Sequence, residues 1–186
     1  MLIVFDVDET LGAFSAFSEF CHTVTKNRVT YELFRLLLNQ NPMFLRPDII
    51  NILSIVKTYK ILSHNKQLKV VLYTNNQGEN SWVDMIRRYL EEKLQYPLFD
   101  QTIRAYMING VQIERCRTQH DKSLKDLLTC TKCPKKTRVF FVDDQLHPDM
   151  IKETVDYFQI RPYSEPCMDV DPSLHLKRYL LLFLEK

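Results

Sequence analysis

Three polar side chains with catalytic potential stand at alternate positions near the start of the chain: Asp6, Asp8 and Thr10. Residues two apart in an extended backbone leave on the same side, so the two carboxylates should lie together. They repel each other unless a cation or a proton lies between them. One carboxylate can attack phosphorus to form an aspartyl phosphate, while its neighbour, oriented by Thr10, transfers protons. The alternative is a surface acidic turn, or a helix start capped by Asp8.

Two further polar clusters follow later apolar runs. Thr74 and Asn75 come after "KVVLY", where a hydroxyl and free backbone N–H groups can hold phosphate oxygens; a turn that caps a helix is the simpler interpretation. Asp143 and Asp144 come after "RVFFV", and paired acids beside a buried sheet are costly unless a cation is close. A solvated loop is the alternative. A site made of a few carboxylates, water and phosphate oxygens favours Mg²⁺ as its cation.

The apolar runs and the helical patterns between them predict an α/β fold, a Rossmann-like parallel sheet with helices on both faces. Sites in such sheets lie beyond the carboxyl ends of the strands, so the three polar clusters should meet at one edge. Strands are expected at Leu2–Phe5, Lys69–Tyr73, 138–142 and 157–160, and helices within 14–37 and at 47–62, 81–94 and 173–184.

Asn109 and Gly110 lie between two strand-like runs, which predicts a small β-hairpin inserted after the second polar cluster and projecting near the site. The length fits one domain, residues 1–186, with a helical segment, residues 12–44, inserted after the first cluster. From the sequence alone, that segment either covers the site or only packs against the sheet.

A phosphoryl site needs a fixed positive charge against the oxygens of the transferred group. Lys122 and Lys125 are the candidates, because both lie near the start of the helical pattern "KSLKDLL". Solvent exposure is the ordinary state of a lysine, so neither is assigned on position alone.

The composition excludes few partners. The net charge of +2, from 25 basic and 23 acidic residues, argues neither for nor against nucleic acid, and only residues 132–138 form a local basic cluster. No apolar run is long enough to cross a bilayer, and we expect no membrane partner and no signal peptide. The five cysteines predict reduced thiols in a cytoplasmic or nuclear protein. Cys130 and Cys133 lack the second pair that a zinc site needs, and His147 is expected to be structural.

These motifs resemble the haloacid-dehalogenase superfamily, in particular the NLI-interacting-factor-like and RNA polymerase II C-terminal-domain phosphatases. Their first motif, D-x-D-x-T, stands here as "DVDETL", the second resembles "VVLYTNN" and the fourth resembles "VFFVDDQ". The "LRP" at residues 45–47 and the hairpin fall where those enzymes carry a similar stretch and a small inserted sheet. The resemblance covers most of residues 1–150.

The resemblance implies roles for single residues. Asp6 is the nucleophile, Asp8 is the general acid and base, and Thr74 binds the phosphoryl group. Lys122 is preferred to Lys125 as the third-motif lysine, because leucines follow it at the offsets that the family has.

The resemblance also implies Mg²⁺ as the cofactor, with Asp6, the backbone carbonyl of Asp8, Asp143 and Asp144 around it. Thr10 and Asn75 complete the expected substrate-binding residues.

The expected function is a Mg²⁺-dependent phosphomonoesterase that forms an aspartyl phosphate, with a phosphorylated protein or peptide as substrate and serine or threonine as the phosphorylated residue. The helical character of residues 12–44 departs from the short strands of the C-terminal-domain phosphatases, which leaves the substrate open. The alternatives are a phosphatase of nucleic-acid ends or small metabolites, and an inactive binding module, against which the intact acidic motifs argue.

Overall fold

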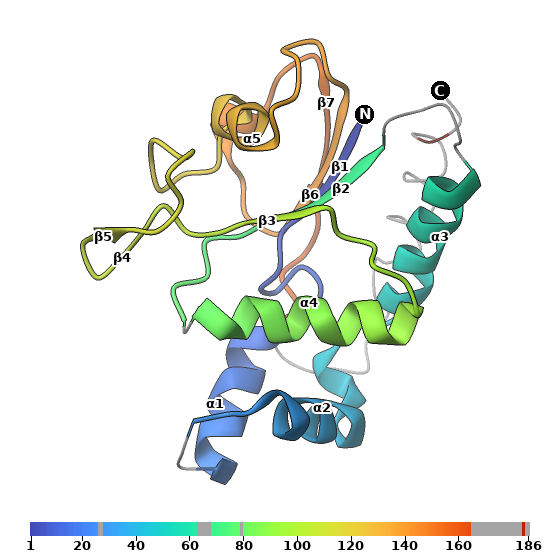
Figure 1. Ribbon diagram of the computed structural model, residues 1–186, viewed down its shortest axis with the longest axis vertical. Coiled ribbons are helices and arrows are strands. Elements are labelled where there is room, and N and C mark those ends of the chain that lie inside the picture. Colours follow the sequence, from blue (N-terminus) through green and yellow to red (C-terminus); the bar gives the residue numbers. More distant parts are fainter. Residues whose placement is uncertain (26–27, 63–67, 79, 165–183, 185–186) are drawn as a thin grey trace.

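The computed structural model describes residues 1–25, 28–62, 68–78, 80–164 and 184, and it contains a five-stranded parallel sheet (Figure 1). The strand order is β3-β2-β1-β6-β7, so the first strand of the chain lies in the centre. The strands are β1 (Leu2–Phe5), β2 (Lys69–Tyr73), β3 (Gln101–Ile103), β6 (Val139–Asp143) and β7 (Val155–Gln159).

The sequence predicted β1 and β2 with their observed bounds, and β6 and β7 with ends shifted by one or two residues. It did not predict β3, which is three residues long and pairs in parallel with the end of β2. Only Ile103 of β3 is fully buried, so the strand lacks the apolar run that marks its neighbours.

The two faces of the sheet carry different side chains, because successive residues of a strand point to opposite sides. In β1, Ile3 and Phe5 pack in one core with residues of the first four helices, whereas Leu2 and Val4 pack in another with Leu127. All of these side chains are buried. Both faces are therefore covered, as nearly continuous apolar strands predict.

Helices form the two outer layers of this α/β fold (Figure 1). The strand residues of the first core pack with α1 (Phe14–Thr25), α2 (Tyr31–Gln40), α3 (Ile49–Leu62) and α4 (Asn80–Leu94), and those of the second with α5 (Leu124–Thr131) and the 3₁₀ turn η2 (Pro148–Met150). The predicted helix at 47–62 begins two residues later, because Pro47 and Asp48 form a turn in which Asp48 has a φ of 61°. The predicted helix at 173–184 lies outside the described residues, apart from Leu184.

The segment at residues 12–44 is helical, as predicted, and consists of α1, α2 and the 3₁₀ turn η1 (Pro42–Phe44). It joins the core through aromatic rings: Phe17 and Phe34 lie 5.2 Å apart between centroids, and both contact Trp82 of α4. Its entry point is Gly12, where a Cβ atom would stand 2.5 Å from the carbonyl oxygen of Phe44. That oxygen also accepts a 2.8 Å hydrogen bond from the Ala13 N–H, so glycine allows the two segments to meet.

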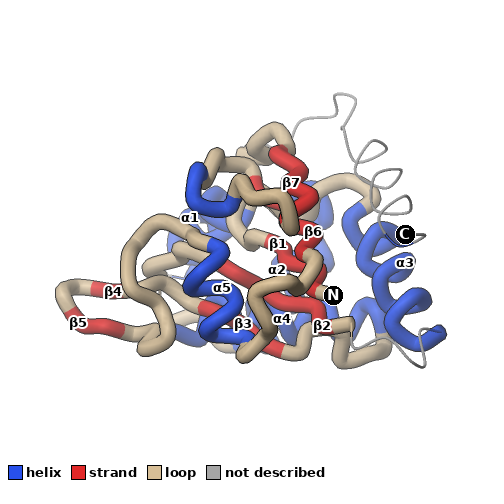
Figure 2. Tube along the Cα trace, turned by 90° about the horizontal axis from the view of Figure 1, so that it is seen from above, coloured by secondary structure: helices blue, strands red, loops and turns tan. Residues whose placement is uncertain are grey.

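The predicted hairpin is present as β4 (Met107–Ile108) and β5 (Val111–Gln112). Asn109 and Gly110 between them have φ values of 49° and 78°, the positive values that a two-residue hairpin turn of this kind requires. Both views place the hairpin on the side of the molecule away from α3 (Figures 1 and 2).

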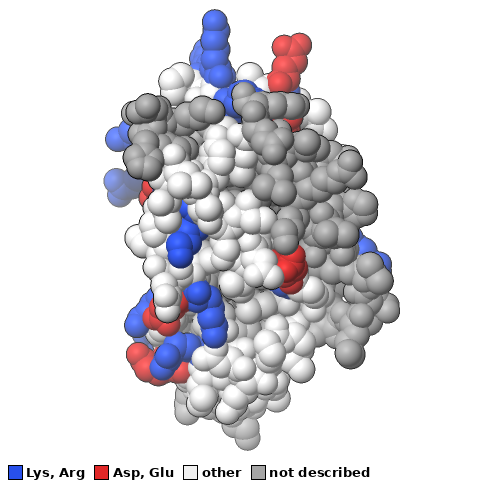
Figure 3. All heavy atoms as spheres, turned by 90° about the vertical axis from the view of Figure 1, so that its right-hand side faces the viewer, with Lys and Arg blue, Asp and Glu red and all other residues white. Residues whose placement is uncertain are grey.

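The described helices include none that is long and apolar enough to span a bilayer. On the face drawn in Figure 3, basic and acidic side chains of the described residues are interspersed among uncharged ones. This face therefore carries no continuous basic stripe within the part of the chain that the structure describes.

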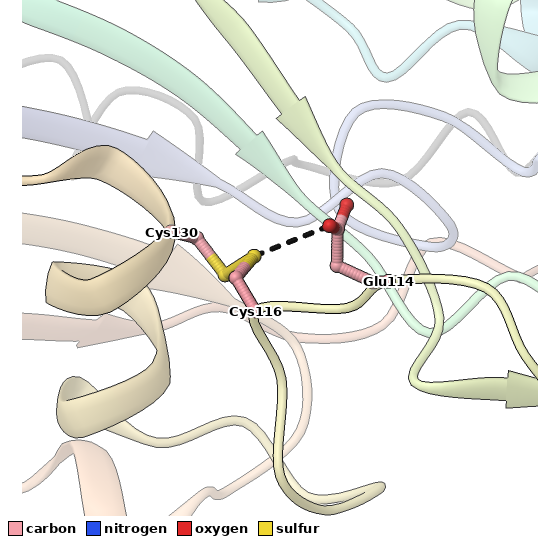
Figure 4. Close-up of side chains that lie close together, drawn as sticks. All are labelled: Glu114, Cys116 and Cys130. Atoms are coloured by element: carbon pink, nitrogen blue, oxygen red, sulfur yellow. Dashed lines mark hydrogen bonds between the residues drawn. A yellow bond between two sulfur atoms is a disulfide. The ribbon is translucent and has the colours of Figure 1, made fainter.

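The cysteines correct one expectation. Cys116, in the loop after β5, and Cys130, in α5, form a disulfide (Figure 4), whereas the sequence predicted reduced thiols. Among the described cysteines, Cys21 and Cys133 are free. The two cysteines meet through the tertiary structure: α5 packs against the loop and brings their Cα atoms to 5.1 Å, a distance that suits a disulfide. Glu114 completes a group of three potential metal-binding side chains, but both sulfurs are used in the disulfide.

Candidate active site

The three polar clusters meet at the carboxyl ends of adjacent strands. Asp6 and Asp8 follow β1, Thr74 follows β2, and Asp143 is the last residue of β6. The chain leaves β1 for β2 and β3 on one side and returns to β6 on the other, so the clusters lie at the switch point where such sheets bind ligands. A cavity of about 270 Å³ opens there, and Ser15 of α1 contributes to its wall.

Lys122 is the positive charge at the centre of this site. Its Nζ donates a hydrogen bond to the Asp6 carboxylate and another, of 2.6 Å, to Oδ2 of Asp143. The side chain is 2% exposed and lies near the rings of Tyr73 and Phe141, whose centroids are 5.8 and 6.0 Å from Nζ. Lys125 is exposed on α5 and lines a different cavity, so only Lys122 of the two candidates reaches the acids.

Asp8 is held by side chains from the loop after β2. Nδ2 of Asn76 lies 3.0 Å from each carboxylate oxygen of Asp8, and the Thr74 hydroxyl donates to Oδ2 over 3.4 Å. Thr74 in turn accepts from the Asn76 N–H, and Asn76 Oδ1 accepts from the Gly78 N–H, so two local turns orient both side chains. Asn75, the predicted residue, lines the cavity.

Thr10 contacts a different acid from the predicted one. Its hydroxyl donates to Oδ1 of Asp144 and accepts from the Asp144 N–H, both at 3.1 Å. The prediction that Thr10 orients Asp8 is therefore wrong: the hydroxyl is buried and directed toward β6. Thr10 holds Asp144 in place and is not among the described residues that line the cavity.

Three carboxylates group closely enough to bind one metal ion. One oxygen from each of Asp6, Asp143 and Asp144 lies within 4.8 Å of the others, and all three residues are buried. When all three carboxylates are ionised, as binding of a metal requires, they and Lys122 carry a net charge of −2, which a divalent cation would neutralise. Oxygen ligands and this charge fit Mg²⁺. The Asp8 side chain lies outside the group.

Burial and neighbouring charges set the proton affinities of the acids. Burial raises the pKa of Asp6 to about 8, against the opposing effect of Lys122, and burial also raises the pKa of Asp8. The pKa of Asp144 is raised by burial and by the adjacent Asp143. Burial also acts to raise the pKa of Asp143, but Lys122 and a hydrogen bond with His147 outweigh it and hold that pKa below its ordinary value.

His147 belongs to the site more closely than the sequence predicted. Its Nε2 lies 3.5 Å from Oδ2 of Asp143, and the residue lines the cavity. The backbone N–H of His147 donates a 3.1 Å hydrogen bond to the hydroxyl of Tyr157. The structural role expected for His147 remains a prediction. The contact with Asp143 is the interaction through which His147 would have that role.

Two buried arginines organise the site, and sequence reasoning missed both roles. Arg117 donates to the carbonyl oxygens of Thr74 and His120, at 3.2 and 2.6 Å, and so joins the loop after β2 to the loop that carries Lys122. Charged residues are usually predicted to lie on the surface, and no residue near Arg117 in the sequence indicates that its side chain is buried.

Arg46, within the "LRP" stretch, holds the loop after β1. It donates to the carbonyl oxygens of Glu9, Thr10 and Arg161, each at 2.7 Å. Glu9 has a φ of 56°, unusual for a residue with a side chain, and two hydrogen bonds to its carbonyl oxygen, from Arg46 and the Tyr163 N–H, hold it there.

Comparison with family models and curated proteins gives no match, so the geometry of the site is the basis for proposing a function. No protein-family model matches the sequence, and no curated protein is significantly similar to it.

Proposed function

We propose that this protein is a Mg²⁺-dependent phosphomonoesterase in which Asp6 is phosphorylated and dephosphorylated in each cycle. The observation that carries the proposal is the buried Lys122, which contacts both Asp6 and Asp143 at the carboxyl ends of adjacent parallel strands. A lysine at this place, beside a second acid with its own donors, is the arrangement that phosphoryl transfer to a carboxylate needs. The parallel sheet and the hairpin before α5 are compatible with the haloacid-dehalogenase arrangement.

In the first half of the proposed cycle, an oxygen of Asp6 attacks the phosphorus of the substrate and the bond from phosphorus to the alcohol oxygen breaks. The Asp8 carboxyl gives its proton to the departing oxygen. Burial raises the pKa of Asp8, which favours the protonated form that this step requires. Asn76 and Thr74 hold the Asp8 side chain toward the cavity.

In the second half, Asp8 is a carboxylate and takes a proton from water while the water oxygen attacks phosphorus. The bond from phosphorus to Asp6 breaks, which regenerates the carboxylate and releases inorganic phosphate. Lys122, which already contacts Asp6, supplies positive charge against the phosphoryl oxygens throughout.

Mg²⁺ would be held by Asp6, Asp143 and Asp144. The motif resemblance implies the backbone carbonyl of Asp8 as a further oxygen ligand. When bound, it neutralises the phosphate oxygens and the surrounding carboxylates. Thr10 keeps Asp144 oriented for this role through its two hydrogen bonds.

The proposed substrate is a phosphoserine or phosphothreonine of a protein. The motif resemblance supports this class, and the cavity is open enough to admit a side chain that projects from a peptide. Rates on phosphopeptides, on 3′-phosphorylated oligonucleotides and on sugar phosphates would rank the substrate classes. A preference for either of the last two would replace the protein substrate but leave the mechanism standing.

The first test is hydrolysis of an aryl phosphate with and without Mg²⁺ by the wild type and by Asp6→Asn. We expect Mg²⁺-dependent turnover that the variant loses, because an amide is a poor nucleophile, and unchanged circular dichroism. Asp8→Asn should lose turnover through loss of the acid and base. Full activity in Asp6→Asn would exclude the aspartyl phosphate, and a wild type inactive with every divalent metal tested would exclude the phosphatase.

The matched pair Lys122→Ala and Lys125→Ala tests the assignment of the positive charge. Removal of a group that stabilises the transition state typically costs about 10² to 10³ in kcat. We expect a loss of this size for Lys122→Ala on the aryl phosphate, and a far smaller one for the exposed Lys125. The reverse order would move the catalytic role to Lys125.

A further inference from the structure

A second and larger cavity lies beside α5, outside the candidate active site. Its volume is about 730 Å³, and its apolar lining comes from Leu124, Leu128 and Cys133. Leu128 is 9% exposed and packs into the sheet core, while Leu124 and Cys133 are half-buried. The cavity is therefore a groove whose apolar floor is fixed to the core.

Basic side chains surround that floor. Lys125, Lys135 and Lys152 line the groove, are exposed, and form no ion pair with a described residue. The one acid of the lining, Asp149, accepts a 2.9 Å hydrogen bond from the amide of Gln119. Three lysines and one aspartate give the lining a net charge of +2. An apolar floor with a basic rim fits a ligand that has apolar and acidic side chains.

The groove adjoins the candidate active site at two places along the chain. Lys122 lines the active-site cavity and the next residue, Ser123, lines the groove. His147 lines the active-site cavity, and Asp149, two residues later, lines the groove. Consecutive Cα atoms are about 3.8 Å apart, so the two linings approach each other at the backbone of these two short segments.

We propose that the groove beside α5 binds an acidic stretch of the phosphoprotein substrate, a few residues from the phosphorylated side chain that enters the active site. The proposal rests on the proposed phosphatase function and adds the recognition of sequence to it. The lysines attract the acidic side chains, and the leucines contact apolar side chains between them. The groove then determines which phosphorylated sites are hydrolysed fastest.

The lining favours a peptide over a nucleic acid. Proteins that bind single-stranded nucleic acid stack its bases on aromatic side chains. Among the described residues that line the groove, none is aromatic, and the floor consists of aliphatic and thiol side chains. Such a floor accommodates apolar side chains of a peptide but offers no surface on which bases stack.

The test compares phosphopeptides of one length whose flanking residues are acidic or the matching amides, each measured against an aryl phosphate. Three exposed charge pairs together amount to about a tenfold effect on affinity, and salt weakens them. We expect kcat/KM to be about tenfold higher for the acidic peptide, through KM and with a preference that declines as salt is added.

Lys135 and Lys136 provide a matched pair of variants, since they are adjacent and exposed but only Lys135 lines the groove. Lys135→Glu should reduce the preference for the acidic peptide, and Lys136→Glu should retain it. Lys125→Glu adds a second groove variant that should fold well, because an acid is favourable in the first turn of a helix. Equal losses in Lys135→Glu and Lys136→Glu would overturn the proposal.

Binding without turnover separates this proposal from the proposed function. Fluorescence anisotropy of the unphosphorylated acidic and amide peptides should show tighter binding of the acidic one, and an RNA oligonucleotide should compete poorly. Equal binding of the two peptides, or equal competition by RNA, would overturn the groove assignment. A wild type that fails on the aryl phosphate but binds the acidic peptide in preference would instead refute the phosphatase.

Discussion

Asn75 and Asn76 are adjacent and chemically identical, yet only Asn76 contacts Asp8. Its amide favours the ionised form of Asp8, so Asn76→Ala should raise the pKa of the general acid. The alkaline limb of the aryl-phosphatase rate, where Asp8 loses its proton, should therefore move to higher pH. Asn75→Ala is the control. A limb that stays in place in Asn76→Ala would show that Asp8 is not the group that titrates there.

Asp6 predicts a pH dependence of stability. Burial raises its pKa from 3.8 to about 8, so the folded state binds this proton more tightly than the unfolded chain. The resulting stabilisation is complete below the lower value and is lost as the pH rises through the upper one. Urea unfolding with EDTA at several pH values in this window should show the wild type losing free energy of unfolding relative to Asp6→Asn. If the free energies of unfolding of the wild type and of Asp6→Asn changed in parallel with pH, the raised pKa of Asp6 would be contradicted.

At the scale of elements, the disulfide between the loop after β5 and α5 closes a loop that contains Lys122. Its cysteines are 14 residues apart, and a loop of this length corresponds to a stabilisation of about 3 kcal/mol. Reduction should lower the free energy of unfolding by this amount. Urea unfolding with and without dithiothreitol measures it. Cys116→Ser should not respond to the reductant, and Cys133→Ser should respond as the wild type does.

Gly12 tests how the helical segment is joined to the sheet. A Cβ at this position would stand 2.5 Å from the Phe44 oxygen, so Gly12→Ala must separate the two segments. Overpacking of this kind costs about 1–3 kcal/mol, which thermal unfolding measures. Gly110→Ala is the comparison: its Cβ would meet open space, and only its φ of 78° opposes the change. An unchanged melting temperature in Gly12→Ala would mean that the contact yields easily.

The elements that sequence predicted well are those with long apolar signals. β1, β2 and the hairpin came from continuous apolar runs and an Asn-Gly turn, and the carboxyl ends of the strands then located most acids of the site. Asn76 and Arg117 were missed because their roles depend on Asp8 and Thr74, which lie 68 and 43 residues away. The disulfide was missed for the same reason. Local patterns do not encode contacts of this kind.

For the whole molecule, metal binding should be visible as stability. A ligand that binds only the folded state at about 100 times its dissociation constant adds about 2.7 kcal/mol. For a protein of this size that corresponds to a rise of roughly 5–10 °C in melting temperature. We expect Mg²⁺ to produce such a rise and EDTA to reverse it. Asp144→Asn should lessen the shift, and a wild type that melts identically in both conditions would count against the metal site.

The central place of β1 has a consequence for synthesis. Leu2 pairs with both Lys69 and Val139, so the strand that precedes Asp6 gains its second neighbour only after residue 139 has been synthesised. At about 5–20 residues per second, that interval is roughly 7–30 s. Throughout it, at least one edge of β1 has no partner, and Asp143, the second acid that contacts Lys122, has not been made. The candidate site therefore cannot be complete before this interval ends.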